Sequence, residues 1–180
     1  MPAADRADIL RFWRDAGPTR WFNKDDAFDD AFRARFLEAH YAAARRELDG
    51  WADDPEGALA LLILLDQFPR NAFRGTAHMF ATDPLALAVA QRAVERDHAA
   101  ALPAEERVFL FLPFMHAEDL AMQELCVRLC EPLGGSAAGY AVIHRDVVAR
   151  FGRFPHRNPL LGRDTTAAER DFLAAGGFAG

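Results

Sequence analysis

The chain has 180 residues, of which 21 are basic and 27 acidic, so its formal net charge at pH 7 is −6. This length suits one domain, and a content of 51% hydrophobic and 27% charged residues is typical of a globular chain rather than a disordered one. The acidic balance argues against a nucleic-acid partner, and no apolar run approaches the roughly 20 residues of a membrane-spanning helix. No basic flank leads into an apolar stretch at the start of the sequence, so we expect no secretory signal and a cytoplasmic protein.

The residue composition favours helices. The sequence contains 36 Ala and 20 Arg but only seven Val and three Ile. Alanine and arginine are among the best helix formers, whereas β-branched residues favour strands. No segment alternates apolar and polar residues over five or more positions, as a half-buried strand does. We therefore predict a single all-α domain over residues 1–180, a compact antiparallel bundle or stack of helical hairpins with about seven or eight helices.

Glycine and proline mark the first helix boundaries. Gly17-Pro18 ends a first helix, and a long helix follows from about Asp25 to Leu48. The pairs Asp54-Pro55 and Asp83-Pro84 each predict an N-cap aspartate followed by a proline in the first helical turn. The segment Gly57–Leu65 is apolar on all sides, so it is expected at the centre of the fold.

The second half of the sequence continues the helical pattern. Val108–Leu112 is again apolar on all sides, with Pro113 expected to end or kink its helix. Further helices are expected from about His116 to Cys130 and from Tyr140 to Phe151. Near the end of the chain, Thr166 and Glu169 have the spacing of a capping box that opens a last short helix.

Ionisable side chains on otherwise apolar helix faces are the informative exceptions. Asp66 ends the all-apolar central segment, and Asp119 is expected beside Cys126 and Cys130 on the helix from His116. His144 lies within an apolar arc on its helix, formed by Tyr140, Ile143, Val147 and Phe151. A buried carboxylate must be paired or protonated, so these acids require cationic partners. The candidates for acid–base roles are Asp66, His116, Glu118, Asp119 and His144.

Two loops that follow helices supply such partners. Phe68-Pro69-Arg70-Asn71 and Phe154-Pro155-His156-Arg157-Asn158 are similar, and the similarity indicates either stacked hairpins or a coincidence between two Phe-Pro helix stops. The predicted ligand-binding residues are Arg70, Asn71, Arg74, Arg153, His156, Arg157 and Asn158. A structural interpretation, in which the arginines only neutralise buried acids and hold helix ends, is favoured over a functional one.

Metal, cofactor and redox chemistry have little support. The histidines and cysteines match none of the common metal-ligand spacings, and no nucleotide or phosphate fingerprint is present, so we predict neither a metal nor a cofactor. Cys126 and Cys130 are neighbours on one helix, where two sulfurs rarely reach disulfide geometry. Reduced, buried thiols are therefore expected.

Three long strings together resemble one bacterial family of uncharacterised proteins, DUF924. They are Pro55–Gly75 (PEGALALLILLDQFPRNAFRG), Leu112–Leu120 (LPFMHAEDL) and His144–Asn158 (HRDVVARFGRFPHRN). The similarity extends over nearly the full length of the chain. It implies an all-helical, tetratricopeptide-like fold, and it brings no established activity, substrate or catalytic residue.

Three functions fit these residues. The first is a helical binding protein whose cleft, formed by residues 66–74, 116–119 and 153–158, takes a small anionic ligand or an acidic peptide. The second is a hydrolase or lyase that uses acid–base chemistry at Asp119 and His144. The third is a structural protein that binds a partner through an exposed apolar patch. The sequence predicts no nucleic-acid or membrane partner and does not indicate an oligomeric state.

Overall fold

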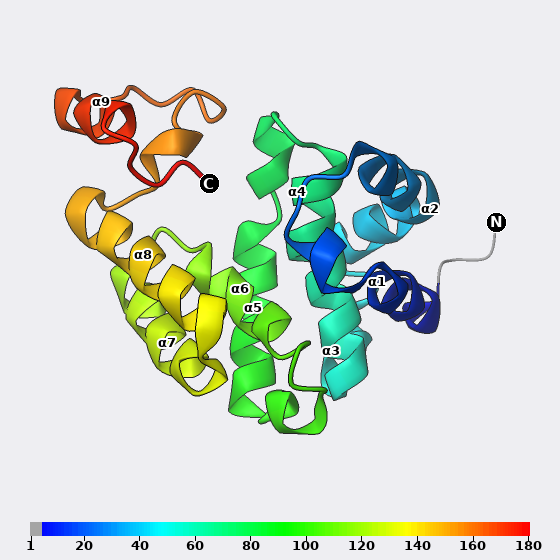
Figure 1. The fold of residues 1–180 in the computed structure, drawn as a ribbon. Coiled ribbons are helices and arrows are strands. Elements are labelled where there is room, and N and C mark those ends of the chain that lie inside the picture. Colours follow the sequence, from blue (N-terminus) through cyan, green and yellow to red (C-terminus); the bar gives the residue numbers. More distant parts are fainter. Residues whose placement is uncertain (1–4) are drawn as a thin grey trace. The chain divides into compact units, whose positions relative to one another are not determined.

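A computed structural model describes residues 5–180, and these are helical or irregular throughout, without a strand. The all-α prediction is confirmed. The expectation about a secretory signal falls partly on residues 1–4, which lie outside the described part of the chain. The chain divides into two compact units, one that extends up to Pro113 and one over Phe114–Gly180 (Figure 1). None of the described helices is long and apolar enough to cross a bilayer.

From residue 5 onward, the first unit contains five complete α-helices, four short 3-10 or π segments and most of a sixth α-helix. In chain order they are α1 (Arg6–Trp21), α2 (Asp26–Ala44), η1 (Asp49–Asp53), α3 (Pro55–Leu62), η2 (Ile63–Gln67), α4 (Phe68–Ala72), η3 (Ala77–Phe80), α5 (Asp83–Glu95), η4 (His98–Ala101) and α6 (Val108–Met115). The division between the units falls inside α6, at Pro113.

The centre of the first unit is α3 and the π-helical segment η2 that continues it. Every residue from Gly57 to Leu65 is buried, as its uniformly apolar sequence predicts. Helix α3 packs against α1, α5 and η1, while η2 packs against α2. At Gly57 the approach to η1 is so close that a Cβ atom would lie 2.1 Å from the carbonyl oxygen of Trp51. Only glycine fits this contact.

Local capping rules account for some helix starts and fail at others. Asp54 accepts a hydrogen bond from the Gly57 amide and Pro55 opens α3, as predicted. The prediction for Asp83 is wrong, because Thr82 occupies the N-cap position and Asp83 is the first residue of α5. The helix predicted to run to Leu48 ends at Ala44, and Arg46 adopts a left-handed conformation beyond it.

The second unit begins within α6 and is built mainly on two packed helices. Its later elements are α7 (Leu120–Cys130), η5 (Glu131–Leu133), α8 (Gly135–Phe151), η6 (Pro155–Arg157) and α9 (Ala167–Ala174). Helix α7 lies along α8, and Figure 1 shows the pair in yellow-green and yellow. A small core of Val147, Val148 and Phe154 is covered by Phe172 and Phe178. The predicted capping box of Thr166 and Glu169 opens α9.

The expected apolar face of α8 is only partly correct. Tyr140 and Ile143 are 53% and 44% exposed, respectively, although both were predicted to flank His144 on the buried face. The buried side chains of α8 are instead Ala141, His144, Val147 and Val148. The packed face is therefore rotated along the helix by about one residue relative to the predicted arc.

Candidate functional site

Asp66 and Arg70 meet inside the first unit. The π-helical segment holds Asp66 at 1% exposure. Its Oδ2 accepts a 2.6 Å hydrogen bond from the side-chain amide Nε2 of Gln67, and its Oδ1 lies 3.3 Å from Arg70 Nη1. Arg70 also donates to both carboxylate oxygens of Asp83, at 2.8 and 3.0 Å. Burial opposes the charge of Arg70, but Asp66 and Asp83 raise the pKa of the guanidinium above its ordinary value. Arg70 is therefore engaged by buried acids.

A second acid, Asp29, binds the other candidates of the first Phe-Pro segment. This segment forms helix α4 (Phe68–Ala72), which continues η2 directly, so the prediction of a loop that follows a helix is wrong here. Asn71 donates to Asp29 Oδ1 at 2.6 Å, and Arg74 donates to Asp29 Oδ2 through Nε at 3.1 Å and Nη2 at 2.9 Å. Asp29 lies on α2, within the run Asp29-Asp30 that reads as a solvated helix start. The sequence carries no local signal that would have singled it out.

Glu118 has the same kind of partnership in the second unit. Its two oxygens accept hydrogen bonds from Arg163 Nη1 and Nη2 at 2.6 and 2.9 Å, and Oε1 also accepts from the Phe154 amide at 2.8 Å. Partial burial raises the pKa of Glu118, but the bonds from Arg163 and Phe154 outweigh it and leave the pKa below its ordinary value. Arg163 follows a glycine in an irregular loop, where no periodicity points to it.

Glu169 engages Arg153 and Asn158. Arg153 donates to it through Nε at 2.7 Å and Nη2 at 2.9 Å, and the Asn158 amide lies 3.4 Å from Oε2. The bonds from Arg153 and from Thr166 lower the pKa of Glu169 to about 2, although desolvation opposes them. Arg153 thus joins the start of α9 to the segment after α8.

The other candidates of the second unit converge. We call His116, His144, His156 and Arg157 the imidazole cluster. The rings of His116 and His144 are 6.3 Å apart, and the ring of Phe178 lies 4.4 Å from His144 and 5.4 Å from His156. The guanidinium carbon of Arg157 lies 4.5 Å from the ring centre of Phe154, which also contacts His144 at 5.5 Å. Residues from three separate segments therefore meet around two phenylalanine rings, with His116 beside His144.

The protonation of His144 follows from its surroundings. Its Nδ1 lies 2.8 Å from the carbonyl oxygen of Tyr140, and because a carbonyl only accepts, Nδ1 carries the proton. Burial, followed by the nearby His116, Arg157 and His156, lowers the pKa of His144 to about 4, against the opposing bond to Tyr140. At neutral pH His144 is therefore uncharged, with its lone pair on Nε2. The neighbours that lower its pKa place it in a positive electrostatic environment.

Asp119 lies outside this cluster. The prediction of a helix from His116 is wrong at its start: α7 begins at Leu120, and Asp119 is its exposed N-cap, which accepts a 3.0 Å bond from the Met122 amide. Aspartate is among the residues preferred at this position, so the local cap decides its place rather than the helical spacing from the cysteines. Because His144 Nδ1 is bonded to Tyr140, the hydrogen bond between an acid and Nδ1 that would orient a catalytic histidine is not formed there.

The two cysteines of α7 form no disulfide and are buried, with their sulfurs 3.8 Å apart. Among residues 5–180, no three His, Cys, Asp or Glu side chains are grouped as metal ligands would be. Asp66, Arg70, Asn71 and Arg74 lie in the first unit and the remaining candidates in the second. A single cleft formed by all three predicted loops stays a prediction.

Comparison with known proteins agrees with this architecture. A family model described as "Bacterial protein of unknown function (DUF924)" matches residues 9–177. The chain belongs to the DUF924 family. The chain matches no curated protein. It is similar to a solved structure described as a protein of unknown function, ATU0120, from Agrobacterium tumefaciens, with 58% identity and a TM-score of 0.93 over 95% of this chain and 97% of the other. The resemblance inferred from the three sequence strings is thereby confirmed, and DUF924 membership brings no activity with it.

Proposed function

We propose that this DUF924 protein is a cytoplasmic binding protein whose imidazole cluster takes a small anionic ligand or the acidic end of a peptide. One observation carries the proposal: three separate segments bring His116 beside His144 and bring His144, His156 and Arg157 against the rings of Phe154 and Phe178. All four were candidates on the sequence alone.

The cluster offers hydrogen-bond donors to an anion at a reachable place. His116 and His156 are partly exposed, whereas His144 and Arg157 are 8% and 6% exposed. An anion that approaches the two partly exposed imidazoles therefore meets donors in a partly desolvated environment, where charge-assisted bonds are stronger than in water. The aromatic rings restrict the ligand to a compact group such as a carboxylate or a phosphate.

The acid–arginine pairs of both units have a different role in this proposal. Arg70, Arg74, Arg153 and Arg163 are each bonded to a carboxylate at 3.1 Å or less. Buried or half-buried pairs of this kind hold segments in place, and a competing ligand has to displace an existing carboxylate. Arg153 and Arg163 hold segments of the second unit in place, and Arg70 and Arg74 hold segments of the first.

The test is a titration of the histidine ring signals by NMR over pH 3.5–7.5, with and without inorganic phosphate or citrate. A bound anion offsets the cationic neighbours, so the pKa of His144 is expected to rise from about 4 toward its ordinary value. Arg157→Met is expected to weaken phosphate or citrate binding by about tenfold or more, since a charge-assisted bond contributes about 1.5–3 kcal/mol.

Two further variants make the titration decisive. Arg128→Met removes an exposed arginine of α7 and is expected to leave anion affinity unchanged. Arg157→Lys keeps a charge at the buried position and is expected to retain part of the affinity. If a folded Arg157→Met protein binds phosphate and citrate as the unmodified protein does, or if neither anion moves any histidine signal, the proposal is wrong.

A further inference from the structure

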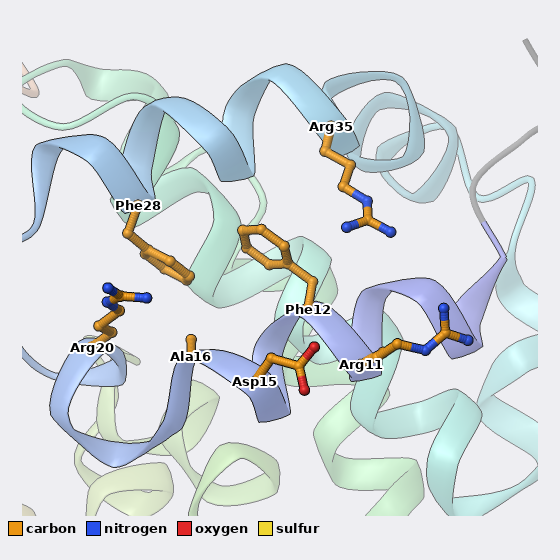
Figure 2. Close-up of a pocket in the computed structure, with 7 residues that line it drawn as sticks. All are labelled: Arg11, Phe12, Asp15, Ala16, Arg20, Phe28 and Arg35. Atoms are coloured by element: carbon orange, nitrogen blue, oxygen red, sulfur yellow. The ribbon is translucent and has the colours of Figure 1, made fainter.

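A surface hollow in the first unit combines an aromatic floor with a rim of arginines. It lies between α1 and α2 and has a volume of about 150 Å³. Figure 2 shows the rings of Phe12 and Phe28 in its middle, with Arg20 on one side and Arg11 and Arg35 on the other. None of these arginines was a candidate from the sequence, because all three lie outside the two Phe-Pro segments that supplied the predicted ligand-binding residues.

The backbone of α1 explains why the hollow exists. Gly17 has φ 70° and ψ 174°, which breaks the helix before Pro18 and directs the next turn, with Arg20, away from the first axis. Ala16 follows Phe12 by one helical turn and has only a methyl group, so it leaves the ring of Phe12 partly uncovered. A larger side chain at this position would fill the space.

The floor is held in place by its packing. Phe12 is stacked on both Phe28 and Phe32, with ring centres 5.2 and 5.3 Å apart and interplanar angles of 19°. Phe28 and Phe32 are themselves 7% and 0% exposed. The face that a ligand would meet is therefore already formed in the free protein.

The guanidinium groups at the rim have donors to spare. Arg11 donates to Asp8 at 3.0 Å, and the same Asp8 oxygen lies 3.7 Å from Arg35. The side chains of Arg11 and Arg35 are 64% and 49% exposed, and Arg35 lies over the ring of Phe12 at 5.7 Å. Each guanidinium carries five N–H donors, so one shared aspartate leaves most of them available.

Arg20 completes the rim in the same way. It lies 3.3 Å from Asp25, whose other oxygen already accepts the amide of Phe28 as the N-cap of α2. Asp15 forms part of the wall. A ligand with one negative group directed toward Arg11 and Arg35 avoids Asp15, whereas a molecule with negative charge along its whole length is repelled by it.

We propose that this hollow is a binding site for a small planar aromatic anion, with its ring on Phe12 and its carboxylate or phosphate at Arg11 and Arg35. A cavity of about 150 Å³ is the size that accepts one benzene-sized ring. The stacked phenylalanines recognise the ring and the guanidiniums recognise the charge. The site is separate from the imidazole cluster and does not depend on the function proposed for it.

The experiment measures benzoate binding to the full chain by ligand-observed and protein-observed NMR, with acetate and benzamide as matched probes. Benzoate has both the ring and the charge, acetate only the charge and benzamide only the ring. Benzoate is expected to shift the Nε signals of Arg11 and Arg35 and to bind at least tenfold more tightly than either probe. A benzoate affinity equal to that of acetate would overturn the proposal.

Substitutions in the hollow separate shape from charge. Ala16→Leu fills the space without changing the charge and is expected to abolish benzoate binding, while Arg35→Gln weakens it about tenfold. Arg45→Gln, at the far end of α2 where Arg45 pairs with Glu47, is the control and leaves binding unchanged. Thermal unfolding of each variant shows that it is folded. Undiminished benzoate binding by folded Ala16→Leu would equally refute the site.

Discussion

The two Phe-Pro segments of this protein share a sequence pattern and one structural device. In the first unit Asn71 donates to Asp29, which also binds Arg74. In the second unit the Asn158 amide lies near Glu169, which also binds Arg153. Each segment thus joins its asparagine to an acid and an arginine. The contacts are alike in kind, but Arg74 follows its asparagine whereas Arg153 precedes its own, so they do not decide between stacked hairpins and a coincidence of two Phe-Pro helix stops.

The arginine directly before the asparagine, Arg70 in the first segment and Arg157 in the second, has different surroundings in the two units. Arg70 lies between two carboxylates, Asp66 at 3.3 Å and Asp83 at 2.8 Å. Arg157 lies against the ring of Phe154, and its positive charge contributes to lowering the pKa of His144. The same Phe-Pro pattern therefore supports a buried ion network in one unit and a cationic cluster in the other. The elements packed against the segment decide which of the two it becomes.

The largest expected effect is on stability. It distinguishes Arg70, which pairs with acids, from Arg157, which is proposed to bind an anion. Arg70→Met removes the guanidinium that faces Asp66 and Asp83, and breaking a buried ion pair costs about 3–5 kcal/mol. We expect the free energy of unfolding in urea to fall by that amount, with phosphate affinity at the imidazole cluster retained under conditions where the variant is folded. Arg128→Met serves again as the exposed control. A loss of unfolding free energy under 1 kcal/mol would show that the ion pairs of Arg70 do not stabilise the first unit.

The pH dependence of stability tests whether His144, in the second unit, is uncharged in the folded protein. His144 titrates near 6.5 when unfolded and at about 4 when folded, so between these values the unfolded chain binds more protons. Stability is therefore expected to rise with pH across this window and to be lost as the pH falls through it, by up to about 3 kcal/mol. Urea unfolding at intervals from pH 4 to pH 7 measures this slope.

The variant His144→Gln tests the assignment of that slope. It is expected to reduce the slope without abolishing it, because burial and His78 lower the pKa of His40 in the first unit against an opposing bond from Leu64. Glu169, whose pKa is lowered from 4.5 to about 2, contributes fully only from about one pH unit above its ordinary pKa, so the slope above about pH 5.5 is free of it. An unchanged slope in His144→Gln would mean that His144 is not held uncharged.

The smallest expected effect compares the two asparagines. Asn71→Ala removes a 2.6 Å bond to Asp29 and is expected to cost about 1.5–3 kcal/mol, the range for bonds to charged groups. Asn158→Ala removes two longer contacts of 3.4 Å, to Thr165 and Glu169, and is expected to cost about 1 kcal/mol. Chemical denaturation of both variants gives the two values. A larger stability loss for Asn158→Ala than for Asn71→Ala would indicate that the asparagine contacts of the two units are not equivalent.

Much of the helical framework was predictable because its signals are local. The cap at Asp54, the capping box of Thr166 and Glu169, and the complete burial of Gly57–Leu65 all follow from residues within a few positions of one another. The errors at Asp83 and Asp119 have a common cause. An aspartate near a helix start can cap the helix or bind an arginine far along the chain, and local spacing does not distinguish the two outcomes.

The candidate site was predictable in its residue types but not in its pairings. His116 and His144 were predicted as acid–base candidates and His156 and Arg157 as ligand-binding candidates, and their role as a site stays a prediction. Their partners were missed, because Arg163 lies in a loop without periodicity and Phe178 lies beyond the last helix. The hollow beside Phe12 was missed entirely, since its arginines look like ordinary solvated residues on two helix surfaces.

Composition and short-range patterns by themselves determined that this chain is all-helical, where most of its helices begin and which segment is buried on every side. They did so because helix propensity, capping and amphipathic spacing act over a few residues. Tertiary structure alone decided which arginine neutralises which acid, which histidine loses its charge and where an aromatic face stays uncovered. Those outcomes depend on side chains far apart in the sequence, such as Glu118 and Arg163, which are separated by 45 positions, and no local rule specifies them.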